Sequence, residues 1–238
     1  MQYYNSETII YTDGAFRKAK DTTTDLYSQS LHYGYAIFEG LRAYNTHKGV
    51  KIFKARAHFD RLQRSCELVN IPFPWNKEEL LEKTYELLEL NGLDDAYVRP
   101  LVYCAPNMSL TAPLDVSIMI CAWKWGAYLG DKQLRVCLSS FQRPNPRSTH
   151  VEAKVSGHYI NSILATTEAK SRGFDEALLL DMNEHVAEGP GANIFIEKNG
   201  KLFTPSKGNI LSGITRATVF EICNLLEIEV EEARISVN

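Results

Sequence analysis

The most informative part of this 238-residue sequence is the stretch Glu188-Gly189-Pro190-Gly191-Ala192-Asn193-Ile194-Phe195. It places a carboxylate before a glycine-rich turn that leads into an apolar segment. Lys154 precedes this stretch, and Gly213-Ile214-Thr215-Arg216 follows it at the start of an expected helix. A single lysine, or a single glutamate before glycines, is usually a solvated residue. The combination of the three features is what points to a chemistry.

Together these features supply what pyridoxal phosphate (PLP) requires. The aldehyde of this cofactor forms a Schiff base with a lysine, and a carboxylate keeps its pyridine nitrogen protonated so that the ring accepts electrons. The free N–H groups and the dipole at a helix start bind a phosphate group. We therefore expect Lys154, Glu188 and the turn Gly213-Ile214-Thr215 to hold PLP, with the Lys154 amine moving the substrate proton.

The order and context of these motifs resemble the class IV aminotransferases, also called fold type IV PLP enzymes. The similarity rests on Glu188-x-x-x-x-Asn193-Ile194-Phe195, on Phe203-Thr204 and on Gly157-His158-Tyr159-Ile160-Asn161-Ser162, and it covers nearly all of the chain. It implies an α+β fold in which two α/β-mixed domains hold the cofactor between them. It also implies that Tyr159 bonds the 3′-oxygen of the cofactor and that Arg56 binds its phosphate.

The position of Arg56 supports an inward orientation of its side chain. Arg56 lies three residues before Phe59, on a helical stripe that is expected to face the core, so its guanidinium is expected to point toward a charge inside the protein. A surface ion pair with Asp60, four residues further on, is the alternative.

Within this class the chain most resembles the branched-chain amino-acid aminotransferases. The likeness lies in Leu31-His32-Tyr33-Gly34-Tyr35-Ala36-Ile37-Phe38-Glu39-Gly40 and in Tyr97-Val98-Arg99-Pro100-Leu101. It implies that Tyr33 and Arg99 meet the distal carboxylate of glutamate. An apolar pocket with a charged group at its edge suits an enzyme that accepts both a branched side chain and glutamate. The substrate site implied by the resemblance consists of Tyr33, Phe38, Gly40, Tyr97, Arg99, Trp125 and Tyr128.

The activity implied by the resemblance is transamination between branched-chain L-amino acids (Leu, Ile, Val) and 2-oxoglutarate, which gives glutamate and branched 2-oxo acids. This reaction belongs to branched-chain amino-acid biosynthesis or to degradation. A homodimer or a higher homo-oligomer is also implied. The alternatives are a D-amino-acid aminotransferase or an aminodeoxychorismate lyase of the same fold, and a non-catalytic PLP-binding protein. Tyr97-x-Arg99 and Trp125-Gly126-Ala127-Tyr128 favour the branched-chain type.

The composition favours small-molecule partners. The net charge is −3 and no long run of lysine and arginine occurs, so nothing favours binding to nucleic acid or to an anionic membrane. The apolar stretches are far shorter than the roughly 20 residues of a membrane span, and the N-terminus has no signal-peptide pattern. The five cysteines show no C-x-x-C spacing and the six histidines no H-E-x-x-H. Reduced thiols, no metal site and a cytoplasmic location are therefore expected.

Periodicity and turn signals predict the order of the elements. A small N-terminal α+β domain is expected over 1–124, an interdomain loop over 125–133, and a larger C-terminal cofactor domain over 134–238. Because the resembling family continues beyond the position of Asn238, this second domain is expected to be incomplete at its C-terminal end. The expected helices are 55–70, 77–90, 159–171 and 215–226. The expected strands are a hairpin within 7–16, then 35–44, 51–54, 96–104, 116–123, 134–140, 176–181, 193–198 and 201–204.

Overall fold

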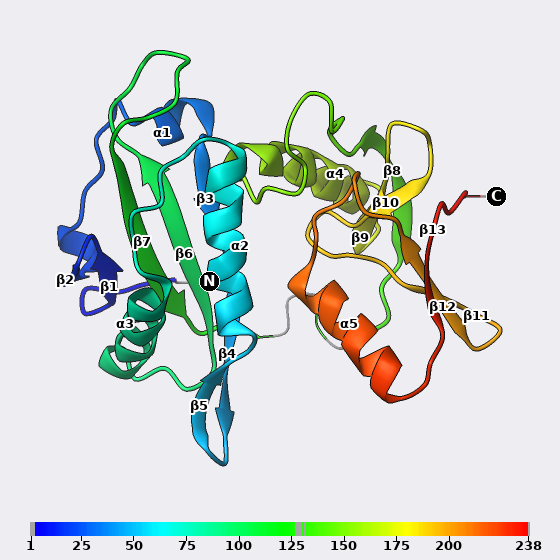
Figure 1. Cartoon of the computed structure of the whole chain (residues 1–238), viewed down its shortest axis with the longest axis horizontal. Coiled ribbons are helices and arrows are strands. Elements are labelled where there is room, and N and C mark those ends of the chain that lie inside the picture. The colour runs from blue at the N-terminus through cyan, green and yellow to red at the C-terminus, as the bar shows by residue number, and fades with distance from the viewer. Residues whose placement is uncertain (1–2, 127–129, 131, 238) are drawn as a thin grey trace. The chain divides into compact units, whose positions relative to one another are not determined.

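The computed structural model describes residues 3–126, 130 and 132–237. The chain forms two compact units, Met1–Asp131 with Ala153–Gly157, and Lys132–Glu152 with His158–Asn238. Figure 1 shows the elements of both. The helices are α1 (Gln29–Tyr33), α2 (Ala55–Leu68), α3 (Lys77–Leu90), α4 (Tyr159–Ser171) and α5 (Ile214–Leu225). The strands are β1 (Ile9–Thr12), β2 (Ala15–Lys18), β3 (Ala36–Phe38), β4 (Leu41–Thr46), β5 (Gly49–Ile52), β6 (Ala96–Cys104), β7 (Val116–Trp123), β8 (Val136–Gln142), β9 (Glu176–Leu180), β10 (Val186–Glu188), β11 (Ile196–Lys198), β12 (Lys201–Pro205) and β13 (Val230–Ala233).

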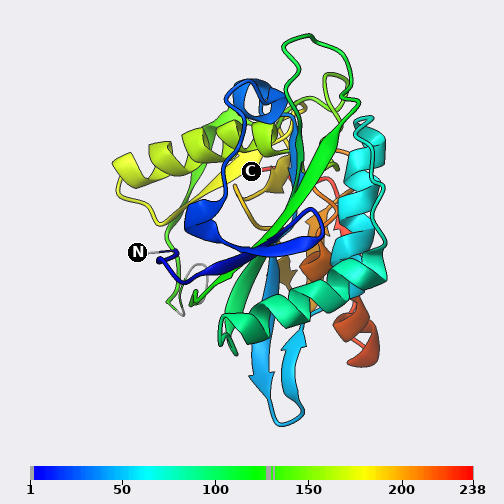
Figure 2. The same ribbon diagram turned by 90° about the vertical axis from the view of Figure 1, so that its left-hand side faces the viewer.

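The first unit is built on an antiparallel sheet of order β2-β1-β7-β6-β4-β5, to which β3 adds by pairing with β6. Helices α2 and α3 lie against one face of this sheet (Figure 2). Their apolar stripes supply Phe59, Leu62, Leu80 and Leu87 to the core, all at most 1% exposed. Burying these side chains is the main favourable term in holding the helices on the sheet.

The central strand β6 separates the core from the functional face. Its burial alternates strictly, with Val98 and Val102 fully buried and Tyr97, Arg99 and Leu101 partly exposed. Successive side chains of a strand point to opposite faces, so β6 packs on α2 and α3 with one set and presents the other set on the opposite face. Arg99 and Tyr97 therefore share a face.

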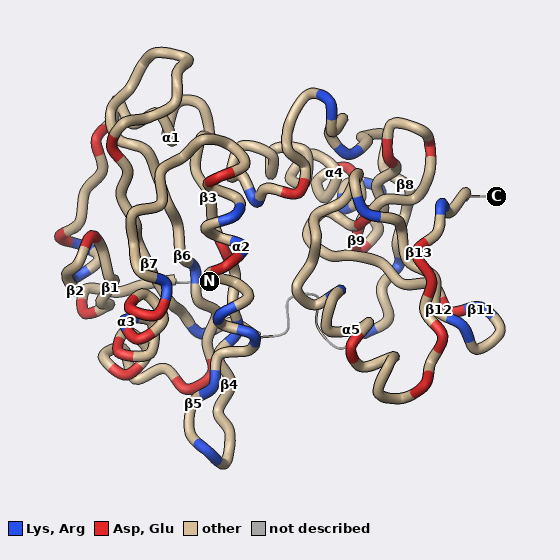
Figure 3. The backbone as a smooth tube through the Cα atoms, in the orientation of Figure 1, with Lys and Arg blue, Asp and Glu red and all other residues tan. Residues whose placement is uncertain are grey.

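The outer surface of α3 is polar. Figure 3 shows acidic residues along this helix, and its N-cap Asn76 accepts hydrogen bonds from the backbone N–H groups of Glu78 and Glu79. Two glutamates in the first turn also interact favourably with the helix dipole. The predicted bounds 77–90 are confirmed at both ends.

The predicted strand 35–44 is interrupted. The structure divides it into β3 and β4, with Glu39 and Gly40 between them outside the strand pattern. The Glu39 N–H still donates to the carbonyl oxygen of Pro100 at 2.9 Å, so the chain stays beside β6 while its direction changes. This break allows the Glu39 side chain to enter the interior of the unit.

The second unit contains two three-stranded sheets, β10-β9-β8 and β11-β12-β13. Helix α4 packs on β8 and β9 through Ala165 and Ala169, which are fully buried against Ala177 and Leu179. The short strands β10 and β13 were not among the predicted elements. Strand β10 ends at Glu188, so the motif glutamate occupies the end of a paired strand.

The division of the chain differs from the predicted domains in two respects. Residues 153–157, which include Lys154, pack with the first unit, whereas the sequence analysis placed them in the C-terminal domain. The second unit is also the smaller one within this chain. The reason is local pairing, because Val155 forms an antiparallel bridge with Ile37 of β3. Among the described residues, no helix has the length and hydropathy to cross a bilayer, and no cluster of metal-ligating side chains occurs.

Candidate active site

Lys154 is held in the first unit by its backbone. Its N–H donates to Ser65 Oγ on α2 at 3.1 Å, and its carbonyl oxygen accepts from the Phe38 N–H at 3.2 Å. The neighbours Ala153 and Val155 are buried in the core of this unit. Two elements distant in sequence therefore fix the position of the lysine.

A close glycine contact fixes the exit of the same segment. The Gly157 N–H donates to the Gly34 carbonyl oxygen at 2.9 Å, and a Cβ on Gly34 would lie 2.7 Å from the Gly157 Cα. Gly34 also has φ +66°, a left-handed conformation that glycine adopts without strain. A side chain at position 34 would therefore displace the segment that carries Lys154.

The Lys154 amine lies in a buried, partly aromatic environment. Its Nζ is 4.8 Å from the centroid of the Phe38 ring. Burial disfavours the charged form and lowers the pKa of Lys154 to about 8. The Glu39 carboxylate opposes this shift, and the Arg61 guanidinium adds to it. An amine with this pKa exchanges a proton near neutral pH more readily than an exposed lysine does.

A buried charge cluster lies beside this amine. The Glu39 side chain is fully buried and accepts from Arg61 Nε at 2.6 Å, from Arg61 Nη2 at 2.8 Å and from His58 Nδ1 at 2.6 Å. Burial alone raises the pKa of Glu39, but the hydrogen bonds and charges of Arg61 and His58 outweigh it and lower this pKa to about 2. Glu39 is therefore an anion that is held by two side chains of α2.

The inward orientation expected for Arg56 is wrong. Its side chain is 74% exposed, and it pairs with Glu78 of α3 at 2.9 Å through two hydrogen bonds. The buried position that the apolar stripe requires is occupied by Ala55, four residues before Phe59, so Arg56 is rotated toward solvent. The predicted alternative partner Asp60 instead pairs with Lys77.

The inward-facing arginine of α2 is Arg61, whose side chain is only 14% exposed. Sequence reasoning missed Arg61, Glu39 and His58. The available signals were the His58–Arg61 spacing of three residues on one helix face, and a glutamate next to Gly40 inside an otherwise apolar strand.

An aromatic wall stands on the exposed face of β6. The Tyr97 ring lies 5.1 Å from Trp123 and 5.0 Å from Trp125 between centroids. The Arg99 guanidinium lies 4.5 Å from the Phe38 centroid and 5.2 Å from the Tyr97 centroid, and it donates to the Tyr97 hydroxyl at 3.0 Å. These distances are typical of cation–π contacts. Arg99, expected at the distal carboxylate, is thus in contact with Tyr97, which was expected in the apolar wall.

Arg99 keeps an unused donor. Its Nε is buried and has no hydrogen-bond partner among the described residues. Arg99 also lines a pocket of about 840 Å³ in the first unit, together with Leu101, Trp123 and Trp125. Arg99 brings a positive charge to this pocket, so the carboxylate of a ligand would be bound favourably there.

The remaining predicted substrate residues have different environments. A Cβ on Gly40 would lie 1.9 Å from the Tyr97 hydroxyl, so glycine makes room for that ring. Tyr33 lies on α1, is 46% exposed and donates to the Met108 carbonyl oxygen at 3.1 Å. Tyr128 lies outside the described residues.

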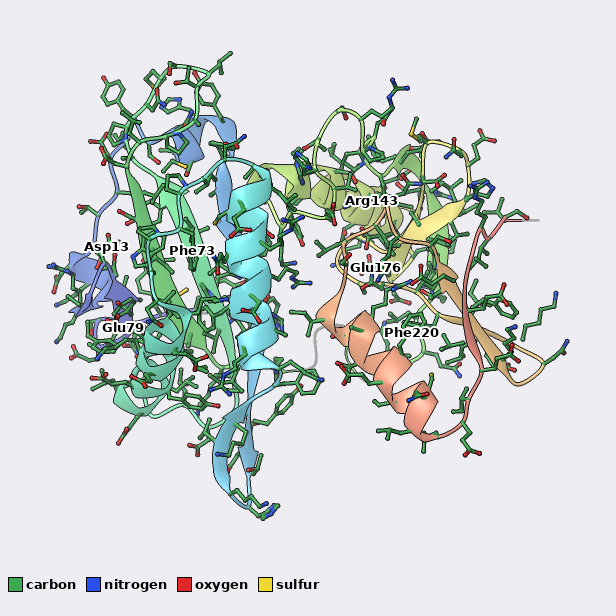
Figure 4. All side chains as sticks on the ribbon, in the orientation of Figure 1. Asp13, Phe73, Glu79, Arg143, Glu176 and Phe220 are labelled. Atoms are coloured by element: carbon green, nitrogen blue, oxygen red, sulfur yellow. The ribbon has the colours of Figure 1, made fainter. Side chains whose placement is uncertain are left out.

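In the second unit, the partners of the Glu188 carboxylate include an arginine, a side-chain amide and a backbone N–H. Arg143, labelled in Figure 4, places its Nε 2.9 Å from Glu188 Oε1. The Asn193 side chain donates to Oε2 at 3.0 Å, and the Leu211 N–H donates to Oε1 at 3.2 Å. Glu188 is 5% exposed, so it is a buried anion with an arginine counter-charge.

Asn193 connects this carboxylate to the start of α5. Its amide donates to the Leu211 carbonyl oxygen at 3.1 Å as well as to Glu188. A Cβ on Gly213 would lie 1.8 Å from Asn193 Oδ1, so a larger residue at the N-cap of this helix would displace the Asn193 amide. Ile214 begins α5, and Thr215 is exposed in its first turn. The N-terminus of a twelve-residue helix with an exposed hydroxyl can receive a phosphate.

Tyr159 is the first residue of α4 and is partly buried in the second unit. The donor set of the two units matches the chemical groups of PLP. An amine with a lowered pKa, a buried carboxylate and a helix start capped by glycine are each present. The residues therefore fit this cofactor.

Comparison with known proteins gives the family. The model of the family described as amino-transferase class IV matches residues 36–238. A branched-chain-amino-acid aminotransferase of Pseudomonas aeruginosa is 41% identical over 99% of this chain and 79% of its own length, and one of Escherichia coli K12 is 36% identical over 95% and 76%.

Solved structures agree with this match. The branched-chain aminotransferase from Thermoproteus uzoniensis with norvaline superposes with a TM-score of 0.94 at 37% identity, covering 97% of this chain and 79% of that one. The T.th. branched-chain amino acid aminotransferase complexed with N-(5′-phosphopyridoxyl)-L-glutamate gives 0.90 at 36% identity, covering 97% and 77%. The predicted α+β architecture of fold type IV is confirmed, and the chain belongs to the PLP-dependent class IV aminotransferases.

Proposed function

We propose that this protein transfers the amino group of a branched-chain L-amino acid (Leu, Ile or Val) to 2-oxoglutarate, which gives a branched 2-oxo acid and glutamate. The observation that carries the proposal is Arg99, whose buried Nε lacks a partner among the described residues and lies within an aromatic wall. The wall suits an apolar side chain, and the guanidinium suits the distal carboxylate of glutamate.

The relatives support this choice of two substrates. The curated relatives are branched-chain-amino-acid aminotransferases. One solved neighbour carries norvaline, an amino acid with an apolar side chain, and another carries a phosphopyridoxyl derivative of glutamate. Both kinds of substrate fit the pocket composition described for the first unit. In this proposal Phe38, Gly40, Tyr97, Trp125 and Tyr128 shape the apolar part of the site, and Tyr33 accompanies Arg99.

PLP supplies the electron sink and the carbonyl carbon that carries the amino group between substrates. In the proposed mechanism Lys154 is the residue that links to the cofactor and then carries the substrate proton, since its amine can both take up and release a proton near neutral pH. Glu188, fixed by Arg143 and Asn193, would hold a proton on the pyridine nitrogen of the bound cofactor. Tyr159 would donate a hydrogen bond to its 3′-oxygen.

For the phosphate we propose the N–H groups of Gly213, Ile214 and Thr215 together with Arg61 in place of Arg56. Arg61 is directed into the first unit by its two hydrogen bonds to Glu39, whereas Arg56 is satisfied at the surface by Glu78. An arginine binds phosphate well because its planar donors match the phosphate oxygens.

A homodimer is also part of the proposal. Helix α1 and the loop between β6 and β7 expose Leu31, Leu110 and Leu114, the last two 87% and 92% exposed. Gln29 anchors this loop through hydrogen bonds to the Ser109 and Thr111 carbonyl oxygens. Several large apolar side chains on one anchored loop are typical of a protein interface. A Leu110→Glu, Leu114→Glu variant is expected to halve the mass measured by light scattering.

The compartment proposed is the cytoplasm, which the five free cysteines support. Free thiols persist where the environment is reducing.

The substrate proposal is tested by the rates of the two half-reactions with a panel of amino acids. Leucine, isoleucine, valine and glutamate are expected to convert the cofactor to its amine form, which is followed by absorbance. Conversion by D-alanine without conversion by L-leucine would instead identify a D-amino-acid aminotransferase, and pyruvate release from aminodeoxychorismate would identify a lyase. Cofactor binding without any conversion would identify a non-catalytic PLP-binding protein.

A further inference from the structure

Glu39 is a fully buried carboxylate in the first unit, and the proposed function assigns it only the orientation of Arg61. It follows Phe38, the last residue of β3, whose ring faces the Lys154 amine. A buried ion is costly to keep unless its partners are in excellent geometry. The placement of this carboxylate next to the reacting amine therefore needs an explanation beyond packing.

We propose that Glu39 is a positioning residue for the Lys154 amine. Its negative charge balances the Arg61 guanidinium, so that the amine keeps its affinity for a proton although it is buried. This inference rests on the proposed function only in naming Lys154 as the proton carrier.

The geometry of α2 supports this role. His58, Arg61 and Ser65 lie at spacings of three and four residues on one face of the helix. The first two bind the Glu39 carboxylate, and the third accepts the Lys154 backbone N–H. One rigid helix face thus sets the position of the carboxylate, the guanidinium and the lysine backbone together.

Two hydrogen bonds from Arg61 fix the direction of its charge. Nε and Nη2 bind the two oxygens of Glu39, Oε1 and Oε2, at 2.6 and 2.8 Å. This fork-to-fork pairing restricts the guanidinium to the carboxylate plane. The His58 Nδ1 donates to Oε2 as well, so the carboxylate cannot turn away.

Nearby negative and positive charges both affect the pKa of the Lys154 amine. Among the described residues, the charged and titratable groups that act on Lys154 include Glu39, which follows β3, Arg61 of α2, and Tyr97 and Arg99 of β6. Glu39 and Tyr97 raise the pKa of Lys154, whereas Arg61 and Arg99 lower it together with burial. Loss of Glu39 alone would leave two guanidinium groups acting on the amine.

The direction in which the pKa of Lys154 changes in Glu39→Gln distinguishes this role from a merely structural one. If Glu39 acts by charge, Glu39→Gln lowers the pKa of Lys154 further, because the positive charge of Arg61 is no longer offset. If Glu39 only holds the packing, the same variant loosens the site, water enters, and the pKa rises toward the ordinary value of about 10.4. The two roles predict opposite signs.

The experiment measures the pKa of Lys154 directly. The full chain, freed of cofactor, is acetylated with trace reagent across a pH series, and the modified Lys154 peptide is quantified against the exposed Lys48. The expected wild-type midpoint is about 8. Glu39→Gln is expected to lower this midpoint by about one pH unit, which is the lower end of the effect of an adjacent opposite charge.

Arg61→Gln provides a second variant with the opposite expectation, a midpoint above that of the wild type. It also keeps the proposal testable if Glu39→Gln does not fold. Glu67→Gln on the exposed side of α2 is the matched control, because it removes the same charge from the same helix and is expected to leave the midpoint unchanged.

A midpoint that rises or stays unchanged in Glu39→Gln, or that does not rise in Arg61→Gln, would overturn the proposal. Because no cofactor or substrate is present, the measurement is independent of which amino acid the enzyme uses. A failed substrate assay with the expected midpoints would therefore contradict the proposed function alone.

Discussion

Both units bury a glutamate against an arginine, but the two carboxylates are held in different ways. Glu39 of the first unit is bound by the side chains of Arg61 and His58, both from the single helix α2. Glu188 of the second unit is bound by Arg143 after β8, by Asn193 in the glycine-rich turn and by the Leu211 N–H before α5.

This difference indicates different tasks. Glu39 is fixed as soon as α2 packs on the sheet, and it lies beside the Lys154 amine, so it is suited to setting the charge on that amine. Glu188 is fixed only when three segments converge, and one of them leads into the helix start at Gly213. It is therefore suited to fixing a carboxylate relative to the start of α5.

The largest effect is expected from Lys154→Ala, which removes the amine on which Glu39 and Arg61 act electrostatically. Turnover of leucine and 2-oxoglutarate should fall at least about 10³-fold, because both the covalent link to the cofactor and the proton carrier are lost. Borohydride reduction of the wild type followed by peptide mapping should place the phosphopyridoxyl group on Lys154. Its recovery on another lysine would refute the assignment.

Acid unfolding tests how much the ionised Glu39 carboxylate stabilises the fold. The folded-state pKa of about 2 is below the ordinary 4.5, so Glu39 stabilises the fold in full above pH 4.5, and this contribution is lost as the pH falls toward 2. The contribution is about 3 kcal/mol. The free energy of unfolding, measured with urea at pH 6 and pH 3, should depend less on pH in Glu39→Gln than in the wild type. An equally steep dependence in the variant would assign the acid sensitivity to other carboxylates.

Glu188→Gln tests the other side. The variant should still bind PLP, but its single-turnover rate with leucine should fall about 10²-fold, since a neutral amide cannot hold a proton on the pyridine nitrogen. In contrast to Glu39→Gln, the midpoint of Lys154 labelling should not change. An unchanged turnover rate would show that Glu188 serves only to connect the turn to α5.

Arg99→Leu is expected to affect one substrate more than the other. The transition state of the half-reaction with glutamate should lose about 2 kcal/mol of stabilisation, the size of a hydrogen bond to a charged group. This loss corresponds to a roughly 30-fold lower rate. The half-reaction with leucine should change much less. Equal losses for both amino acids would indicate that Arg99 binds the shared α-carboxylate or supports the fold.

The smallest effect is expected from Arg56→Ala. This residue is exposed and pairs with Glu78 at the surface, so cofactor affinity measured by fluorescence titration should equal that of the wild type. Arg61→Ala should lower the affinity for the cofactor, because the guanidinium that is proposed to bind its phosphate is lost. Weaker binding in Arg56→Ala alone would restore the sequence-based assignment of the phosphate to Arg56.

The sequence could predict what is local. The helices 77–90 and 159–171 follow from apolar periodicity and end signals, and both have the predicted bounds. Glu188 is conspicuous because a glycine-rich turn follows it, and Lys154 because it shortly precedes Gly157-His158-Tyr159 at a helix start. Arg56 was misjudged because a helical stripe is wide enough for either Ala55 or Arg56 to face inward, and only packing against the sheet decides which one does.

The charge cluster of the first unit could not be predicted in the same way. Glu39 and Arg61 are 22 residues apart, and their pairing depends on the interruption of a predicted strand at Glu39 and Gly40. A break of this kind has no strong signature in a single sequence, since one glycine in a strand is compatible with several local structures.

The most direct test of the central claim follows the nitrogen atom. Wild-type protein is incubated with [¹⁵N]leucine, PLP and 2-oxoglutarate, and the products are resolved by mass spectrometry. The account predicts [¹⁵N]glutamate and 4-methyl-2-oxopentanoate in equal amounts, and neither product with Lys154→Ala. Release of ¹⁵N as ammonia, or label transfer that persists in Lys154→Ala, would contradict it.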